Sequence, residues 1–182
     1  MPAVISMFRG VNLGPHRRIK MDALRGVYEG LKFQNVQTYV QSGNVVFHTK
    51  EADLVRLAKR IGAAFEKEFG FSSEVLLRTA TEMQSAIARN PFTGRGGIEP
   101  NRLLVVFLGA DPGDDARQKV RALKTDTEEL FIDGREIYIY YRNGMARPKL
   151  NMAHVEKAVK TAWTGRNWNS VTKLLEMAQA LD

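Results

Sequence analysis

One order of predicted elements occurs twice along the chain, and it restricts the possible folds more than any single motif does. Hydrophobic periodicity predicts strand, helix, strand, strand, helix, strand and helix in each half. The predicted ranges in the first half are strand 3–8, helix 21–32, strands 36–41 and 45–49, helix 53–69, strand 73–78 and helix 79–89. Those in the second half are strand 102–108, helix 111–124, two strands joined at Asp133-Gly134, helix 151–160, strand 161–164 and a helix from Asn167 or Trp168. This order is typical of the split βαβ, or ferredoxin-like, unit, so we predict an α+β protein built as a tandem duplication of ferredoxin-like α/β sandwich units.

Local signals mark where several of these elements begin and end. Gly70 is a good residue to end the second helix, and Thr79 with Glu82 matches a capping box for the third. Asp111-Pro112 looks like a cap followed by a first-turn proline. Residues 90–100 are rich in Pro and Gly, which favours a break. We therefore predict an N-terminal unit over residues 1–90, a linker over 91–101 and a C-terminal unit over 102–182.

The composition is that of an ordinary folded protein. Of the 182 residues, 44% are hydrophobic and 26% are charged. No apolar run approaches the ~20 residues of a membrane helix, and the N-terminus lacks the pattern of a secretion signal, so we expect a cytoplasmic protein with no membrane partner. The chain has no cysteine, which excludes disulfides, thiolate nucleophiles and cysteine-ligated metals.

The positive charge is concentrated in the first half. The formal net charge is +7, and residues 1–90 carry 13 Lys and Arg against 8 Asp and Glu, compared with 14 against 12 in the rest. Such an excess favours anionic partners, although basic surfaces also serve solubility alone.

A basic loop follows the first predicted strand and precedes the first predicted helix. Residues 9–20 combine glycine and proline with cationic side chains, next to a helix N-terminus that attracts anions. In a split βαβ unit the first two strands are parallel, so this loop and residues 41–44 are expected at one edge of the sheet. The candidate ligand-binding residues there are Arg9, Asn12, His16, Arg17, Arg18, Lys20, Ser42 and Asn44. The alternative for residues 42–44 is a tight hairpin turn, with Gly43 supplying a positive φ.

A second basic rim is expected in the C-terminal half, where the third and fourth strands of the unit end together. Its candidate ligand-binding residues are Arg147, Lys149, Arg166 and Asn167. Asn167 is also a good N-cap for the last helix. Tyr138 and Tyr140 share one face of the last hairpin, which suits either a stacking platform for bases or ordinary structural packing.

The sequence contains little recognisable catalytic chemistry. The three histidines, His16, His48 and His154, lack partners at ligand spacing, so we predict no metal site and no cofactor. No Gly-x-Ser-x-Gly motif surrounds Ser42, which gives no reason to assign a nucleophile. His16 is the one histidine that lies in the basic loop and is a candidate acid or base, or simply a solvated side chain. The catalytic residues, if there are any, stay unknown at this point.

Several segments resemble one bacterial family along nearly the whole chain. They are residues 9–12, 19–21, 38–47, 90–92, 149–150 and 164–169. In these segments the chain resembles the family known as domain of unknown function 1697 (DUF1697). The resemblance implies the duplicated α+β fold, and it implies no established substrate, cofactor or catalytic residue.

Three functional hypotheses follow from the sequence. The leading one is a protein that binds an anionic partner, nucleic acid or a nucleotide, through residues 9–20 and 42–44. The alternative is an enzyme acting on a small phosphorylated or carboxylated metabolite, with the same loop orienting the substrate. The third is an oligomer-forming scaffold, and the sequence does not specify an oligomeric state.

Overall fold

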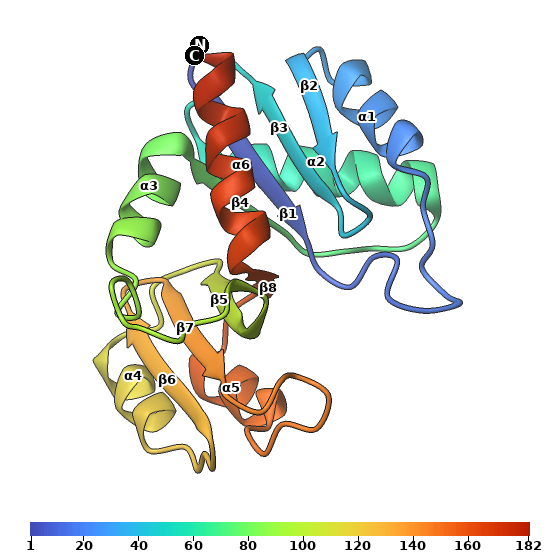
Figure 1. Ribbon diagram of the computed structural model, residues 1–182. Helices are drawn as coiled ribbons and strands as arrows, with labels where there is room; N and C mark the ends of the chain where they lie inside the picture. The colour runs from blue at the N-terminus through green and yellow to red at the C-terminus, as the bar shows by residue number, and fades with distance from the viewer. The chain divides into compact units, whose positions relative to one another are not determined.

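A computed structural model describes residues 1–182 and divides them into two compact units. Unit 1 comprises Met1–Ser85 together with Lys173–Asp182, and unit 2 comprises Ala86–Thr172 (Figure 1). Each unit contains one four-stranded antiparallel sheet, and the chain has six α-helices, so the fold is mixed α+β. The similarity of the two units fits a duplication. No helix combines the length and the apolar character that crossing a membrane requires.

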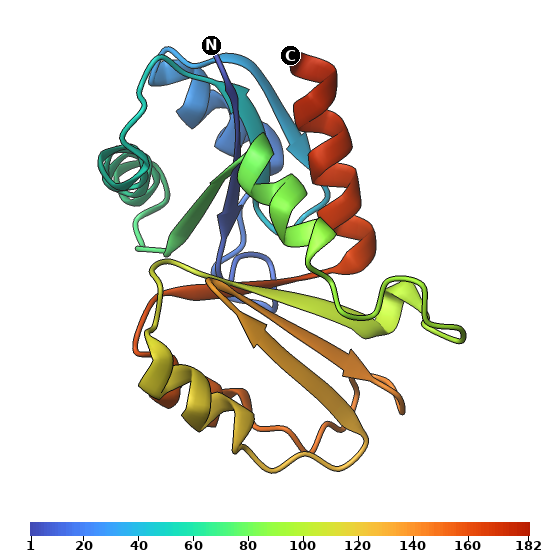
Figure 2. The same cartoon turned by 90° about the vertical axis from the view of Figure 1, so that its left-hand side faces the viewer.

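The sheet of unit 1 has the strand order β2-β3-β1-β4. Its elements are β1 (Ala3–Phe8), α1 (Met21–Gly30), β2 (Gln34–Tyr39), β3 (Asn44–His48), α2 (Leu54–Phe69), β4 (Val75–Thr79) and the part of α3 (Ala80–Ala88) up to Ser85. In Figure 2, α1 and α2 lie on one face of this sheet, while α3 and the final turns of α6 (Trp168–Leu181) lie on the other. Residues 173–182 therefore group with unit 1, although the order of elements along the chain places them with the second half.

The sheet of unit 2 has the corresponding strand order, β6-β7-β5-β8. Its elements are a 3-10 turn (Pro100–Arg102), β5 (Leu103–Leu108), α4 (Asp114–Arg121), β6 (Glu128–Asp133), β7 (Glu136–Tyr141), α5 (Met152–Val159) and β8 (Trp163–Asn167). One face packs on α4 and α5 through Val106, Val120 and Val155. On the other face, Phe92 packs against Tyr140 with ring centroids 5.7 Å apart, so part of the predicted linker packs within unit 2.

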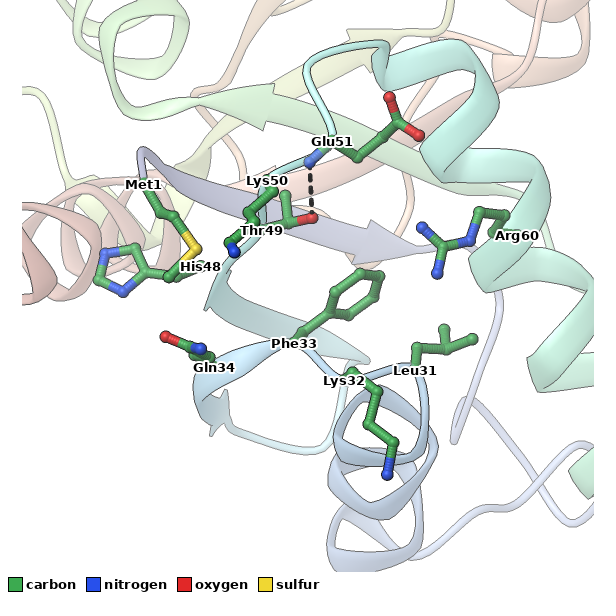
Figure 3. Close-up of a pocket in the computed structure, with 10 residues that line it drawn as sticks. All are labelled: Met1, Leu31, Lys32, Phe33, Gln34, His48, Thr49, Lys50, Glu51 and Arg60. Atoms are coloured by element: carbon green, nitrogen blue, oxygen red, sulfur yellow. Dashed lines mark hydrogen bonds between the residues drawn. The ribbon is translucent and has the colours of Figure 1, made fainter.

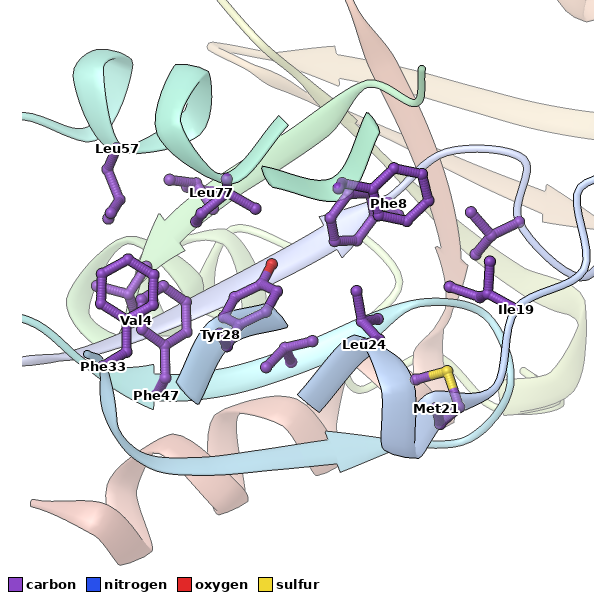
Figure 4. Close-up of a cluster of buried hydrophobic side chains, with 14 residues drawn as sticks. Val4, Phe8, Ile19, Met21, Leu24, Tyr28, Phe33, Phe47, Leu57 and Leu77 are labelled. Atoms are coloured by element: carbon purple, nitrogen blue, oxygen red, sulfur yellow. The ribbon is translucent and has the colours of Figure 1, made fainter. Parts of the chain in front are cut away.

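An aromatic core holds unit 1 together between its sheet and the helices α1 and α2 (Figure 4). Phe8 stacks on Phe65 with ring centroids 4.6 Å apart, and Tyr28 meets Phe47 edge-on at 5.0 Å. The same core includes Ile19, which is only 7% exposed at the end of the basic loop. Burial of this side chain therefore fixes the loop to the core.

The predicted local signals are mostly confirmed. Gly70 ends α2 in the left-handed conformation, at φ 77°. The Thr79 and Glu82 capping box forms in both directions, because each backbone N–H donates to the other side chain, at 2.9 and 3.1 Å. β6 and β7 are joined at Gly134, which has φ 56°.

The helix predicted to begin at Asp111 instead begins at Asp114 and ends at Arg121. Asp111 Oδ1 accepts hydrogen bonds from the backbone N–H of Gly113 and from the guanidinium of Arg117, at 2.8 and 2.7 Å. These bonds hold Asp111 in the turn that precedes the helix. Gly113, at φ 86°, is the residue at the N-cap position.

Several predicted strands have shifted bounds, and two of these shifts have a clear cause in the backbone. β2 ends at Tyr39 rather than at residue 41, because Val40 adopts φ 49° and leaves the extended conformation. The last strand runs from Trp163 to Asn167 rather than over 161–164, because Lys160 ends α5 at φ 50° and the chain then turns. Polar side chains such as Thr164 and Arg166 are buried in this strand, so hydrophobic alternation does not reveal its length.

Candidate functional site

The basic loop and the turn between β2 and β3 lie against each other at one end of the sheet of unit 1, as the sequence predicts. Asn12 connects them, because its Nδ2 donates to the carbonyl of Gln41 at 2.7 Å. Asn12 Oδ1 accepts from the backbone N–H of Ile19 at 2.8 Å, and Asn12 N donates to the carbonyl of Arg17 at 3.1 Å. Asn12 adopts φ 57°, a conformation that asparagine tolerates better than most residues. Its role in the structure is therefore to hold the two ends of the loop and the neighbouring turn together.

Ser42, Gly43 and Asn44 form the tight turn that the sequence analysis gave as the alternative to a ligand site. Gly43 has φ 81°, and its carbonyl accepts from Phe8 N at 3.0 Å. Asn44 is fully buried, and its Nδ2 donates to the carbonyl of Tyr39 and to Ser42 Oγ. Asn44 thus stabilises the turn from inside.

Two arginines of the loop, Arg9 and Arg17, contact other parts of unit 1, and the third, Arg18, lines a hollow. Arg9 pairs with Glu74 at 3.1 Å. Arg17 donates to the carbonyls of Gly10 and Ser72, at 3.2 and 2.9 Å, and its guanidinium lies 4.8 Å from the ring centre of Phe71. These contacts tie the loop to the segment before β4, so Arg17 supports the loop.

Arg18 and Lys20 are the cations that face a hollow on this rim. Arg18 uses its Nε to donate to the carbonyl of Gly14 at 2.8 Å. Lys20 is exposed at the N-cap position of α1, where no side chain caps the helix. A hollow of about 480 Å³ is lined by Asn12, Arg18, Ile19, Lys20 and Gln41. Its walls therefore provide two positive charges, two amide side chains and one apolar side chain.

Three further side chains of the loop and the neighbouring turn are exposed but do not line this hollow. His16 lies exposed in the loop, as does Leu13, which is 82% exposed. Val40, in the neighbouring turn, is 49% exposed and has a positive φ, which is rare for a β-branched residue. Strained backbone conformations tend to cluster at functional sites, so the strain at Val40 favours a functional role for this rim.

The second predicted rim has a different structure. Lys149 pairs with Asp126 at 3.2 Å, and Arg147 is exposed. Arg166 is buried at 7% exposure, and Nη1 donates to Thr164 Oγ1 and to the carbonyl of Gly165. Desolvation lowers the pKa of the Arg166 guanidinium to about 10. The predicted side chains are thus distributed between an ion pair, the surface and the interior.

Two other predicted features of unit 2 have structural roles. Asn167 caps α6, because its Oδ1 accepts from Ser170 N at 2.9 Å. Tyr138 and Tyr140 share a face as predicted, but they do not form an exposed platform. Both are buried, and their hydroxyls donate to the carbonyls of Ala86 and Gly97.

A second hollow in unit 1 was missed by the sequence analysis. It lies where β3 ends, and Lys32, Phe33, Lys50 and Arg60 are among the residues that line it. These residues come from three separate segments and form no linear motif. The hollow could have been anticipated by the argument used for the basic loop, that segments at the same end of neighbouring strands lie close together. That argument was applied only to the opposite end of the sheet.

Neither end of the sheet contains a familiar catalytic arrangement. His48 is buried between Asn35 Nδ2, 2.9 Å from Nδ1, and Asp182 Oδ1, 3.3 Å from Nε2. No group of three His, Asp or Glu side chains is arranged to hold a metal ion. The arrangement at the first rim is suited to binding, through charge and amide hydrogen bonds.

Comparisons with known proteins identify relatives without naming an activity. The chain is similar over 97% of its length to a solved structure described as conserved bacterial protein SP0830 from Streptococcus pneumoniae, with a TM-score of 0.70, 19% sequence identity and 98% of that chain covered. At this identity the similarity concerns the fold alone. The comparison with curated proteins found no match. Residues 1–138 match the family model described as "Protein of unknown function (DUF1697)". Because this match covers well over half of the sequence, the chain belongs to the DUF1697 family.

Proposed function

We propose that unit 1 binds a phosphate-bearing partner, a nucleotide or a single strand of nucleic acid, at the rim formed by residues 9–20 and 41–44. The observation that carries this proposal is the lining of the 480 Å³ hollow, in which Arg18 and Lys20 are present and no carboxylate is. A phosphate can accept hydrogen bonds from a guanidinium, an ammonium and an amide. The N-terminus of α1 has no side-chain cap at Lys20, and the helix dipole there also attracts an anion.

The rigidity of the rim supports the same proposal. Asn12 fastens the loop to the turn, Ile19 anchors it in the core, and Arg17 ties it to the segment before β4. A site held in place before the ligand arrives loses less conformational entropy on binding. The volume of the hollow also lies within the range of about 300–1,000 Å³ that is common for small-molecule sites.

The alternative, an enzyme acting on a small phosphorylated or carboxylated metabolite, would use the same cations to orient its substrate. His16 is the candidate for proton transfer, and it is exposed in the loop. Neither His16 nor any carboxylate lines the hollow, so binding is the better supported function.

We test the proposal by fluorescence anisotropy with two probes, a labelled 12-nucleotide single strand and a labelled ATP analogue, between 50 and 200 mM NaCl. Arg18→Ala with Lys20→Ala is expected to weaken binding of one or both probes by about tenfold. For the oligonucleotide, loss of two phosphate contacts should also reduce the slope of log K against log salt by about 1.4. Lys59→Ala with Lys67→Ala removes the same charge from exposed positions on α2 and serves as the control.

Three outcomes would contradict the proposal. Wild-type protein that binds neither probe would refute it, as would identical binding by the rim variant and the wild type. Equal weakening by the control pair would show that net charge alone attracts the probes. Tighter binding of the oligonucleotide than of the ATP analogue would identify a nucleic-acid strand as the partner, and the reverse would identify a free nucleotide.

We also propose that each unit is a ferredoxin-like split βαβ module. The strand orders β2-β3-β1-β4 and β6-β7-β5-β8 support this proposal, together with the antiparallel pairing of every neighbouring pair of strands. In each unit one strand of the hairpin lies between the two strands of a βαβ crossover.

A further inference from the structure

The second hollow lies at the end of the unit 1 sheet opposite the basic loop. β3 begins at Asn44, beside the loop, and ends at His48, beside the second hollow. The hollow has a volume of about 500 Å³ (Figure 3). The two hollows therefore share no lining residue, and a ligand in one would not occupy the other.

Positive charge exceeds negative charge in this hollow. Lys32, Lys50 and Arg60 line it, and the one carboxylate in the lining is that of Glu51. Both oxygens of that carboxylate are already engaged, since Oε1 accepts from the backbone N–H of Asp53 at 3.2 Å and Oε2 lies 3.6 Å from Arg56 Nε. Glu51 therefore compensates a cation outside the lining, and the three cations of the hollow have no carboxylate partner within it.

The hollow is built on rigid parts of unit 1. Phe33 is 8% exposed and packs on Phe47 with ring centroids 4.7 Å apart. The guanidinium of Arg60 lies 5.6 Å from the ring centre of Phe33. On the other side, the backbone N–H of Glu51 donates to Thr49 Oγ1 at 3.1 Å, which fixes the turn that carries Lys50. In Figure 3, Lys50 and Arg60 lie on either side of Phe33.

We propose that this hollow is a second binding site, for a small polyanion with at least two phosphate or carboxylate groups. Cations from three separate segments line one hollow, so a ligand with several negative charges can contact more than one of them. An anion bound in this hollow would offset part of the positive charge of its lining. This site is independent of the proposed function, because it uses none of the residues of the loop rim.

The test is isothermal titration calorimetry of the full chain with sodium triphosphate and, separately, with citrate in 100 mM NaCl. Saturable binding of at least one probe is expected, with one probe bound per chain at this hollow. Arg60→Ala and Lys50→Ala should each weaken that binding by tenfold or more, whereas Arg60→Lys should retain part of it. Lys59→Ala, the neighbouring exposed position on α2, is the matched control and should change the affinity by less than twofold.

Each outcome either supports the site or overturns it. Binding of triphosphate alone identifies phosphate as the preferred group, and binding of citrate alone identifies carboxylate. Absence of saturable binding for both probes overturns the proposal, and so does a loss with Lys59→Ala as large as that with Arg60→Ala. The variant Arg18→Ala with Lys20→Ala should still bind one probe per chain, because the second hollow uses neither residue, and this separates the second hollow from the loop rim.

Discussion

Replacing Gly43 by alanine should destabilise unit 1 strongly, because two independent costs fall on this position. Gly43 has φ 81°, a region that residues with a Cβ adopt only at a cost of roughly 1–2 kcal/mol. An added Cβ would also lie 2.7 Å from Val11 Cγ2 and 2.9 Å from Phe8 Cβ. Both neighbours are buried, at 1% and 0% exposure, so neither can move into solvent.

The size of the effect follows from the sum of these two costs. Overpacking a filled core costs about 1–3 kcal/mol, which added to the backbone cost gives roughly 2–5 kcal/mol for Gly43→Ala. Gly70→Ala is the matched control, because Gly70 has φ 77° and nothing lies within 4 Å of the added Cβ. The control should therefore lose only the backbone part, and entropy changes in the unfolded chain are the same for both variants. The difference between the variants isolates the overlap with Val11 and Phe8.

Urea denaturation followed by far-UV circular dichroism measures both variants. The two tryptophans, Trp163 and Trp168, belong to unit 2, so tryptophan fluorescence reports on that unit. Gly43→Ala is expected to lose about 1–3 kcal/mol more than Gly70→Ala, which corresponds to roughly 2–12 °C in Tm for a chain of this size. Equal losses in the two variants would refute the reasoning, since they would mean that the turn does not approach the end of β1 as closely as described.

Two further predictions concern local hydrogen bonds. Thr79→Ala should lower the free energy of unfolding by about 1 kcal/mol, measured by urea denaturation, because it removes the acceptor for Glu82 N, and Thr79→Ser should keep most of that stability. Glu128→Gln should cost about 1–3 kcal/mol at pH 7, because the carboxylate accepts from the backbone N–H groups of Asp126, Lys149 and Leu150. Burial raises the pKa of Glu128, but these hydrogen bonds outweigh it and hold the pKa below its ordinary value of 4.5. The difference in free energy of unfolding between wild type and Glu128→Gln should therefore have its full size above pH 4.5 and decrease as the pH falls through the lowered pKa. A difference that stays constant down to pH 2 would contradict this reasoning.

The order of elements and the meeting of the first two loops could be predicted from the sequence because both depend on local pattern and topology. The stripe of apolar residues on α2 matches the burial of Leu57, Ile61 and Phe65. Parallel strands end at the same edge of a sheet, and Asn12 accordingly reaches Gln41. Apolar positions that repeat along one element leave a signal in the sequence, and the order of the elements indicates which loops follow parallel strands.

The use of each cation could not be predicted, because it depends on which groups the folded chain brings within hydrogen-bond distance. Arg17 and Arg18 are adjacent and have the same side chain. Arg17 reaches Ser72, which is 55 residues away along the chain, while Arg18 bonds to Gly14 within the loop and lines the hollow. Likewise, nothing in the spacing of Tyr138 and Tyr140 shows that residues 86–99 supply carbonyl and ring partners on that face of β7.

A pair of buried arginines that the sequence alone does not align is the feature of the two units that best fits a duplication. Arg78 lies opposite Ile5, the third residue of β1, and Arg166 lies opposite Val105, the third residue of β5. Each is the second-to-last residue of the last strand of its sheet, and Nη1 of each donates to the carbonyl of the residue before it.

The residue after each arginine opens the next helix. Thr79 caps α3 through Glu82 N, and Asn167 caps α6 through Ser170 N, so each cap serves the backbone N–H three residues later. Arginine, cap and helix therefore recur at matching register in both units. The caps differ in residue type, and the helices that follow share little sequence, which explains why periodicity reveals the repeated order whereas residue identity does not. A buried arginine followed by a capping residue at the end of the fourth strand is the feature by which we expect the two halves of other chains with this fold to be recognised.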